Sequence, residues 1–395
     1  MVSPDETSAI EPHQPLLVAI ERAGLGLAGR RTARGRAWLP ALALLVLALG
    51  GCTQLGPSLV KAGRNDYNVA VQQTNDEQVL LNVVRMRYSD NPLWLNVGSV
   101  TTQFNFAQGV SGGLDRDVDV LRYGWRVGAD VRYSETPTIS YSPLKGEQFV
   151  RNIMAPMNFR TFMLLANAGW DIERLMRLTV SRINGLGNAP AAEGPTPRTA
   201  PPYAEFQRAA RLLGTLQSSG AIRFRHQEPA TRTRPGLFFQ PDALDSPEAR
   251  ELRALLGLEV TKRVYDLHIL ADKPSADSIG IELRSLVEML NFLSISVEVP
   301  ARDEEAGRVT VTRDASGQRF DWSRMMDGLF RVRSQGEQPT DAVVAVQYRG
   351  AWFFIDDRDI DSKDTFRLLN QVGSILAGET EPSQAPVLTL PVGGG

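Results

Sequence analysis

Five aspartates within nine residues form a dense cluster of potential metal ligands or catalytic acids. They lie in the segment FFIDDRDIDSKD, and the carboxylates at 357, 359 and 361 have the spacing with which a calcium loop begins. The rest of that pattern is missing, because Ser362 stands where a glycine is needed and Leu368 where a bidentate glutamate belongs. We therefore predict a strand end, a polar turn and a helix cap, with cation binding as the alternative. The five residues are Asp356, Asp357, Asp359, Asp361 and Asp364.

The histidines and serines do not form a recognisable catalytic or metal-binding motif. His226 and His268 lie far apart, and neither has a His or Cys partner at helical spacing, so no metal site is predicted. The residues of a Ser-His-Asp triad, or two carboxylates for glycan cleavage, can be far apart in the sequence and need only meet in space, so both stay possible. No sequence motif supports them, because the chain has no G-x-S-x-G elbow. It also has no phosphate-binding loop. We predict no catalytic residue, no metal ligand, no cofactor and no small-molecule ligand.

A locally basic run, RFRHQEPATRTR, could contact an acidic partner or lipid headgroups, although a solvated loop face is the preferred interpretation. It contains Arg223, Arg225, Arg232 and Arg234. Over the whole chain, 43 Lys+Arg balance 45 Asp+Glu, which gives no sign of a nucleic-acid binder. With 43% hydrophobic residues, the composition excludes collagen, coiled-coil and fully disordered classes.

The single cysteine, Cys52, rules out an intrachain disulfide and follows an apolar run, residues 37–50, with the sequence AWLPALALLVLALG. This run is shorter than the ~20 residues of a transmembrane helix. A basic flank, a short apolar run and small residues at its end are typical of a secretory signal. The basic flank consists of Arg30, Arg31, Arg34 and Arg36.

The end of the run, Leu49-Gly50-Gly51-Cys52, resembles the lipobox of bacterial lipoproteins. The resemblance implies cleavage between Gly51 and Cys52 and attachment of diacylglycerol to the thiol. Acyl chains such as palmitate would then hold the protein on the membrane, at ~0.8 kcal/mol per buried methylene. Thr53 stands where an aspartate would favour the inner membrane, so the resemblance implies the outer membrane, facing the periplasm. A buried core cysteine is the alternative.

The chain beyond the anchor contains both helical and strand-like patterns. Apolar spacing predicts a helix over residues 75–88 with an N-cap at Asn75 or Asp76, and further helices in 145–185, 203–220, 246–258 and 363–378. The last helix within 145–185 covers 171–185, with Asp171 as its N-cap candidate. Alternation predicts strands in 93–106, 124–133 and 136–143, with a turn at 134–137. Gly109, Gly112 and Gly113 with Asp115 and Asp117 are expected to form a flexible loop between strands. Alternation also predicts a strand in 263–270 and a hairpin turn at Arg349-Gly350. Residues 275–300 are expected to form a helix followed by a strand.

Aromatic residues gather in the strand-rich segment, at Tyr123, Trp125, Tyr133 and Tyr141. We interpret them as a sheet face packed under helices, with an exposed docking surface or an edge close to the outer membrane as the alternative. The strand-like run at 387–390 could add to a partner's sheet or complete the chain's own.

The order of these elements predicts an α+β fold with antiparallel sheet and hairpins, preceded by a cleaved signal peptide. Residues 1–51 form the signal, whose long acidic start indicates a true start codon further along, and residues 52–63 the lipidated tether. A helix-sheet-helix lobe follows over 64–186, then a proline-rich linker or loop over 187–202. An α+β lobe over 203–379 and a Pro/Gly-rich tail over 380–395 complete the chain. A single domain in place of two lobes stays open.

These features favour a non-enzymatic lipoprotein that acts as a scaffold or accessory subunit of a cell-envelope assembly. Its expected partners are the membrane, through lipidated Cys52, and other envelope proteins. The alternative is a lipid-anchored hydrolase of cell-wall glycan or peptide.

Overall fold

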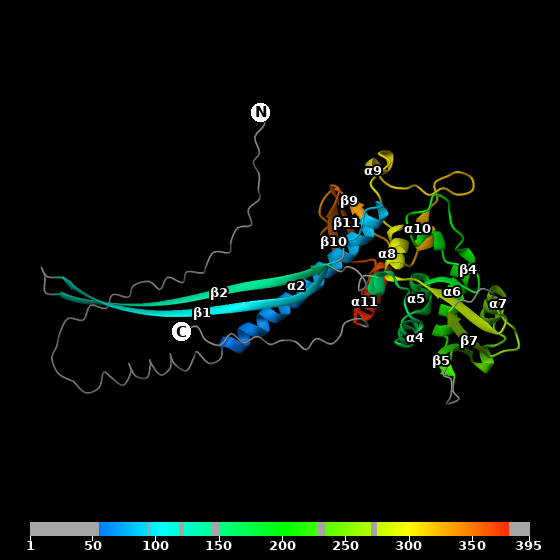
Figure 1. The fold of residues 1–395 in the computed structure, drawn as a ribbon, viewed down its shortest axis with the longest axis horizontal. Coiled ribbons are helices and arrows are strands. Elements are labelled where there is room, and N and C mark those ends of the chain that lie inside the picture. Colours follow the sequence, from blue (N-terminus) through cyan, green and yellow to red (C-terminus); the bar gives the residue numbers. More distant parts are fainter. Residues whose placement is uncertain are drawn as a thin grey trace. The chain divides into compact units, whose positions relative to one another are not determined.

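The computed structural model describes residues 55–93, 95–117, 122–143, 150–227, 234–269 and 275–378. The chain divides into two units, residues 1–67 and 68–395. The fold is α+β, as the sequence predicts, with a mixed sheet, an antiparallel sheet and a long hairpin accompanied by helices (Figure 1). Among the described residues, no helix combines the length and the apolar character needed to cross a bilayer.

The first described element is helix α2, Leu55–Arg87, which begins 20 residues before the predicted start at residue 75. The predicted N-cap at Asn75 or Asp76 is therefore wrong, and both residues lie inside the helix. No proline or glycine interrupts residues 64–87, so nothing in the backbone stops the helix there, and Pro57 lies in its first turn, where proline is tolerated. Asp76 accepts a hydrogen bond from Asn370 Nδ2 at 2.6 Å.

Two long strands, β1 (Leu95–Asp117) and β2 (Arg122–Pro143), pair antiparallel into one hairpin. The predicted turn at 134–137 and the predicted glycine-containing loop at 109–117 are wrong, because both segments lie within the strands. Pro137 pairs with Thr102, and a two-stranded ribbon tolerates proline because alternate N–H groups point away from the partner strand. The glycines are likewise accommodated within the continuous ladder.

The larger sheet has six strands in the order β4-β3-β8-β7-β6-β5, and only the β7–β8 pair is parallel. Helices α4, α5 and α6 contact its strands. Its strands are β3 (Val180–Ile183), β4 (Leu186–Gly187), β5 (Ile222–Gln227), β6 (Arg234–Phe239), β7 (Val264–Ile269) and β8 (Ser278–Leu283). The smaller sheet is antiparallel, in the order β10-β11-β9, with strands β9 (Arg333–Gln335), β10 (Ala342–Tyr348) and β11 (Ala351–Asp356).

The α-helices after the hairpin are α4 (Phe159–Asn167), α5 (Ile172–Thr179), α6 (Ala204–Ser218), α7 (Pro247–Leu256), α8 (Leu286–Ser294), α9 (Ala301–Glu305), α10 (Trp322–Met326) and α11 (Ile360–Gly378). A π-helical turn, η2 (Val150–Met154), and two 3-10 turns, η3 (Pro190–Ala192) and η4 (Pro241–Ala243), complete the described helical elements.

Local signals explain several of these boundaries. Helix α8 begins with a full capping box, in which Ser285 and Glu288 each satisfy the other's backbone N–H. The hairpin turn predicted at Arg349-Gly350 is confirmed, with φ of 49° and 74°, the pair of positive angles that a type I′ turn needs.

Two predicted elements are corrected. The helix over residues 171–185 ends at Thr179, because the chain continues into β3, which pairs with β8. Residues 275–300 contain a strand followed by a helix, the reverse of the predicted order. Residues 278–283 pair with β7 as β8, and Ser285 then caps the start of α8.

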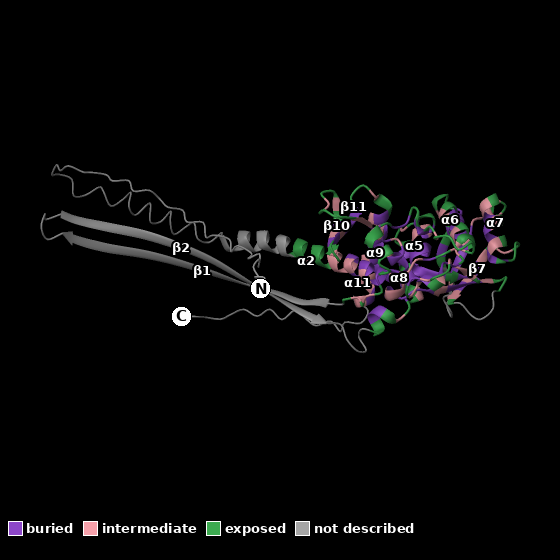
Figure 2. Ribbon diagram, turned by 90° about the horizontal axis from the view of Figure 1, so that it is seen from above, coloured by how far each residue is buried: buried purple, intermediate pink, exposed green. Residues whose placement is uncertain are grey.

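Buried apolar residues between 80 and 376 form one hydrophobic cluster. The proline-rich segment 187–202 contributes Ala189 and Ala192 to it, each 0% exposed. Described residues before and after that segment therefore share one core. Figure 2 shows the buried residues concentrated around α5 and α8.

Candidate functional site

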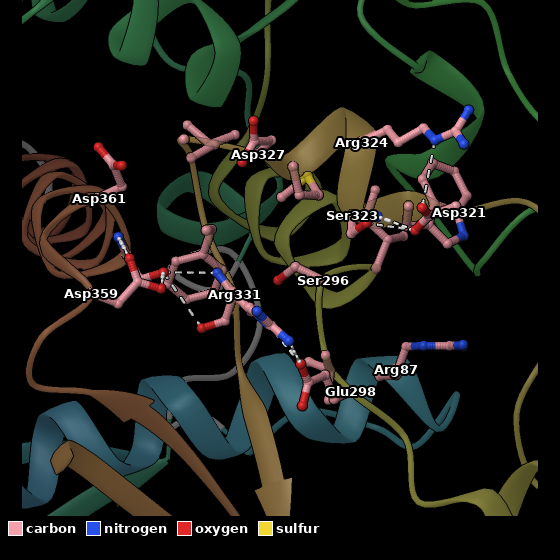
Figure 3. Close-up of a pocket in the computed structure, with 18 of the residues that line it drawn as sticks. Arg87, Ser296, Glu298, Asp321, Ser323, Arg324, Asp327, Arg331, Asp359 and Asp361 are labelled. Atoms are coloured by element: carbon pink, nitrogen blue, oxygen red, sulfur yellow. Dashed lines mark hydrogen bonds and ion pairs between the residues drawn. The ribbon is translucent and has the colours of Figure 1, made fainter. Parts of the chain in front are cut away.

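A pocket among the described residues has a volume of about 730 Å³. Four parts of the chain line it, namely the last turn of α2, residues 295–299 after α8, residues 319–331 around α10 and residues 359–362 at the start of α11. Figure 3 shows its labelled charged and polar side chains. All four segments lie in the second unit of the chain, residues 68–395.

Several charged side chains of this pocket form ion pairs or cap a helix. Arg331 Nε donates to Glu298 Oε1 at 2.6 Å, as Figure 3 shows. Asp321 accepts from Ser323 N at 3.0 Å and from Ser323 Oγ at 2.6 Å, and so caps α10. The hydrogen bond from Ser323 lowers the pKa of Asp321, which keeps this carboxylate ionised at neutral pH and unsuited to donate a proton.

Arg87 is a buried cation on the edge of the pocket, with only 5% of the residue exposed. Its Nη1 donates to Thr310 O at 3.1 Å and to Thr196 Oγ1 at 3.4 Å, while its Nε has no hydrogen-bond partner. Burial lowers its pKa. The guanidinium therefore bridges the end of α2 to two distant loops, which holds that helix end in place.

A second polar cluster also fixes the end of α2. Asp303 is 0% exposed and accepts from Tyr88 Oη at 2.7 Å and from Arg308 Nη1 at 2.7 Å. Burial by itself would raise the pKa of Asp303, but the hydrogen bonds from Tyr88 and Arg308 outweigh it and lower that pKa. Nearby, Arg349 Nη2 donates to Asp90 Oδ2 at 2.8 Å. These contacts join α2 to α9 and to the β10–β11 turn.

The aspartate cluster near the C-terminus forms a strand end, a turn and a helix cap, as the preferred interpretation predicts. Asp356 accepts from Arg333 at 2.9 Å at the end of β11. Asp359 accepts from Ser362 N at 3.1 Å at the start of α11. Asp357 pairs with Lys363, Asp361 with Arg174 and Asp364 with Arg367. In the described part of the chain, no three His, Cys, Asp or Glu side chains gather where a metal ion could bind.

The other residues singled out from the sequence are dispersed. His268 is partly buried on β7, and His226 lies on β5 in register with Pro235. Arg223 and Arg225 are exposed on β5, where they alternate with buried residues, as expected of a solvated face. Arg234 begins β6, whereas Arg232, Gly51, Cys52 and residues 387–390 lie outside the described residues.

Sequence reasoning missed the residues that hold the pocket together, above all Arg87 and Asp303. Arg87 bonds to Thr196 and Thr310, and Asp303 to Tyr88, across 109 to 223 residues of the chain, so no local spacing could reveal these contacts. The length of the β1–β2 hairpin was also missed, although continuous alternation through 122–143 carries that signal.

No protein-family model, no curated protein and no solved structure matches this chain.

Proposed function

We propose that this chain is a lipid-anchored lipoprotein of the outer membrane that faces the periplasm and acts as a non-enzymatic structural subunit of a cell-envelope assembly. The anchor is inferred from Leu49-Gly50-Gly51-Cys52 and the basic, apolar segment before it. Thr53 supports the outer membrane over the inner one.

The observation that carries the structural role is the β1–β2 hairpin. Its strands of 23 and 22 residues are several times longer than the ~5–6 residues of an ordinary strand. A two-stranded hairpin is at best marginally stable by itself, and each of its outer edges presents unpaired N–H and C=O groups. Among the described residues no third strand pairs with this hairpin, and strands from other subunits of an assembly would stabilise it.

The paired charges of the pocket agree with this role. Arg331 and Glu298 form an ion pair, and Asp321 caps the start of α10. A hydrolase needs an acid and a base whose protonation states suit proton transfer at the working pH. Acidic and basic side chains of the described pocket already form hydrogen bonds and ion pairs within the protein.

The anchor is tested with Cys52→Ser, which removes the thiol that takes up diacylglycerol. We expect this variant to incorporate no radiolabelled palmitate and to retain residues 1–51, whereas Thr53→Ser, the matched control, is processed normally. Thr53→Asp should move the processed protein from the outer to the inner membrane in density fractionation. Normal palmitate incorporation by Cys52→Ser contradicts the proposed anchor.

The structural role is tested in intact envelopes by chemical crosslinking followed by purification of the tagged chain, alongside turnover assays with peptidoglycan. We expect a crosslinked assembly of defined stoichiometry and no release of wall fragments. A monomeric protein that releases glycan or peptide fragments overturns the proposal in favour of the hydrolase.

A further inference from the structure

The two faces of the β1–β2 hairpin have opposite character. Directly paired residues in an antiparallel ladder share a face, and successive pairs alternate between the two faces. One face takes five consecutive alternate pairs in which Gln108 is the only polar residue. These pairs are Phe106/Tyr133, Gln108/Val131, Val110/Ala129, Gly112/Val127 and Leu114/Trp125.

The opposite face of the same stretch takes small, polar and charged residues. Its pairs are Asn105/Ser134, Ala107/Arg132, Gly109/Asp130, Ser111/Gly128 and Gly113/Arg126. Alternation of mainly apolar with mainly polar positions, with all the charges of this stretch on one face, is the pattern of strands that separate lipid from water.

A bulge preserves this pattern toward the start of β1. The register shifts between Val97 and Ser99, so Gly98 is an extra residue on that strand. Because of it, the Val97/Tyr141 pair falls on the same face as Val100/Ile139, although Val97 and Val100 are separated by an odd number of positions. An uninterrupted strand would place Val97 on the polar face.

The length of the apolar band matches a membrane. Residues 106–114 and 125–133 are nine residues each, within the ~9–11 residues of a membrane-spanning strand. At ~3.4 Å per residue the band extends about 27 Å along the strand, or about 21 Å at a ~40° tilt, against an apolar height of ~25 Å. On the same face the first charges beyond the band are Arg116 at one end and Glu135 at the other. Tyr133 and Trp125 lie at its two ends, where aromatic residues are typical.

The hairpin cannot span lipid by itself, because unpaired backbone groups on its outer edges are costly to place in hydrocarbon. Both edges need a partner strand throughout the band. Pro137, which could not donate to such a strand, lies outside residues 125–133. A second hairpin of the same sequence offers a band of equal length and the same alternation of faces.

We propose that hairpins from several copies of this chain pair edge to edge, β1 of one copy with β2 of the next, into a closed transmembrane sheet. Residues 106–114 and 125–133 lie in the membrane, with the apolar face toward lipid and the face carrying Arg126, Asp130 and Arg132 toward a water-filled interior. Head-to-tail pairing of this kind closes into a ring and leaves no free edge. The location of this sheet in the outer membrane rests on the proposed function.

The orientation of the faces is tested on the processed full chain in phosphatidylethanolamine/phosphatidylglycerol vesicles. Cys52 is the only native cysteine and is blocked by lipid, so a single new cysteine can be labelled with an environment-sensitive fluorophore. We expect nitroxide-bearing acyl chains to quench the label at Val127→Cys, Ala129→Cys and Val131→Cys severalfold more than at Gly128→Cys and Asp130→Cys. Ile139→Cys, on the apolar face beyond Glu135, is the matched control and should resist quenching.

Equal quenching at odd and even positions overturns the proposal, as does a lack of quenching at all five. This readout is separate from the anchor. Alternating quenching in a protein whose native Cys52 takes up no palmitate would refute the proposed anchoring alone. Normal palmitate incorporation at Cys52 without alternating quenching would refute the transmembrane sheet alone. If Cys52 takes up no lipid, its thiol is free to react, so the labelling cysteine is then introduced into a Cys52→Ser background.

The pairing between copies is tested by mixing two differently tagged populations in the vesicles. One carries Ser111→Cys on β1, and the other carries Gly124→Cys, Gly128→Cys or Arg132→Cys on β2, a set that samples different registers. We expect disulfides between differently tagged chains for at least one β2 position, and far fewer between two copies of Ser111→Cys. Disulfides only between identical positions would indicate a two-fold dimer, and a monomer would show none, so either result overturns the ring.

Discussion

Replacing Arg284 with methionine should destabilise the protein more than any ordinary surface substitution. Arg284 lies between β8 and α8, is 0% exposed, and has its guanidinium 3.8 Å from the centre of the Phe292 ring. Its Nε donates to Glu193 Oε1 at 2.8 Å. Its two terminal nitrogens donate to the backbone carbonyls of Arg177, Leu178 and Asn188.

The cost of Arg284→Met follows from what the substitution leaves behind. Methionine retains much of the apolar stem, but the largely buried carboxylate of Glu193 loses its ion pair and three carbonyls lose a donor. Removing one partner of a buried ion pair costs about 3–5 kcal/mol. We expect the free energy of unfolding to fall by an amount in that range.

The assay is equilibrium urea unfolding followed by circular dichroism, with Arg182→Met as the matched control. Arg182 on the neighbouring strand β3 pairs with Glu282 at 3.8 Å, and both side chains are 47% exposed, so its loss should cost ~0–1 kcal/mol. The reasoning that burial of the ion pair sets the loss of stability would be refuted by either of two results. One is an equal decrease in the free energy of unfolding for the two variants, and the other is a decrease below ~1.5 kcal/mol for Arg284→Met.

Three further predictions concern the other polar clusters. The pKa of Asp303 is lowered on folding, so its contribution to stability is present above the ordinary value of 3.8 and is lost as pH falls through the lower folded pKa. In Asp303→Asn, the free energy of unfolding measured in urea should therefore depend less on pH between about pH 5 and the folded pKa. An unchanged pH dependence would contradict this prediction. Asp359→Ala removes the cap of α11 and should cost ~1 kcal/mol in urea unfolding, against less than ~0.5 for the exposed Asp357→Ala. Because the carboxylates of Asp356 and its neighbours already bind protein cations and N–H groups, millimolar Ca²⁺ should leave the melting temperature unchanged, and a rise would reveal a cation site.

Local chemistry predicted much of the secondary structure. Arg349-Gly350 forms the predicted hairpin turn because both residues adopt positive φ between two alternating strands. The N-cap predicted at Asp171 is confirmed, with its carboxylate accepting from Glu173 N and Arg174 N. In these cases neighbours along the chain supply the whole interaction, so the pattern of residues contains the answer.

Errors arose where a signal had two meanings. Ser134 to Pro137 has the composition of a turn, yet the pairing of β1 with β2 continues through it, because a ribbon edge tolerates proline. Asn75 and Asp76 resemble helix caps, yet they lie within α2 because no residue before them stops the helix. Only the partner strand or the surrounding helix decides between the two meanings.

By itself, the sequence determined the α+β class, the alternation of the hairpin strands and the lipobox-like segment at Cys52, because each depends on residue type and short-range spacing. The tertiary structure decided which buried polar residues hold the fold and the surroundings of the candidate site together. Arg87, Asp303 and Arg284 find their partners across the fold, and their burial makes those contacts costly to lose. The register of β1 against β2 likewise comes only from their pairing, and it is this register that sorts apolar and charged residues onto opposite faces.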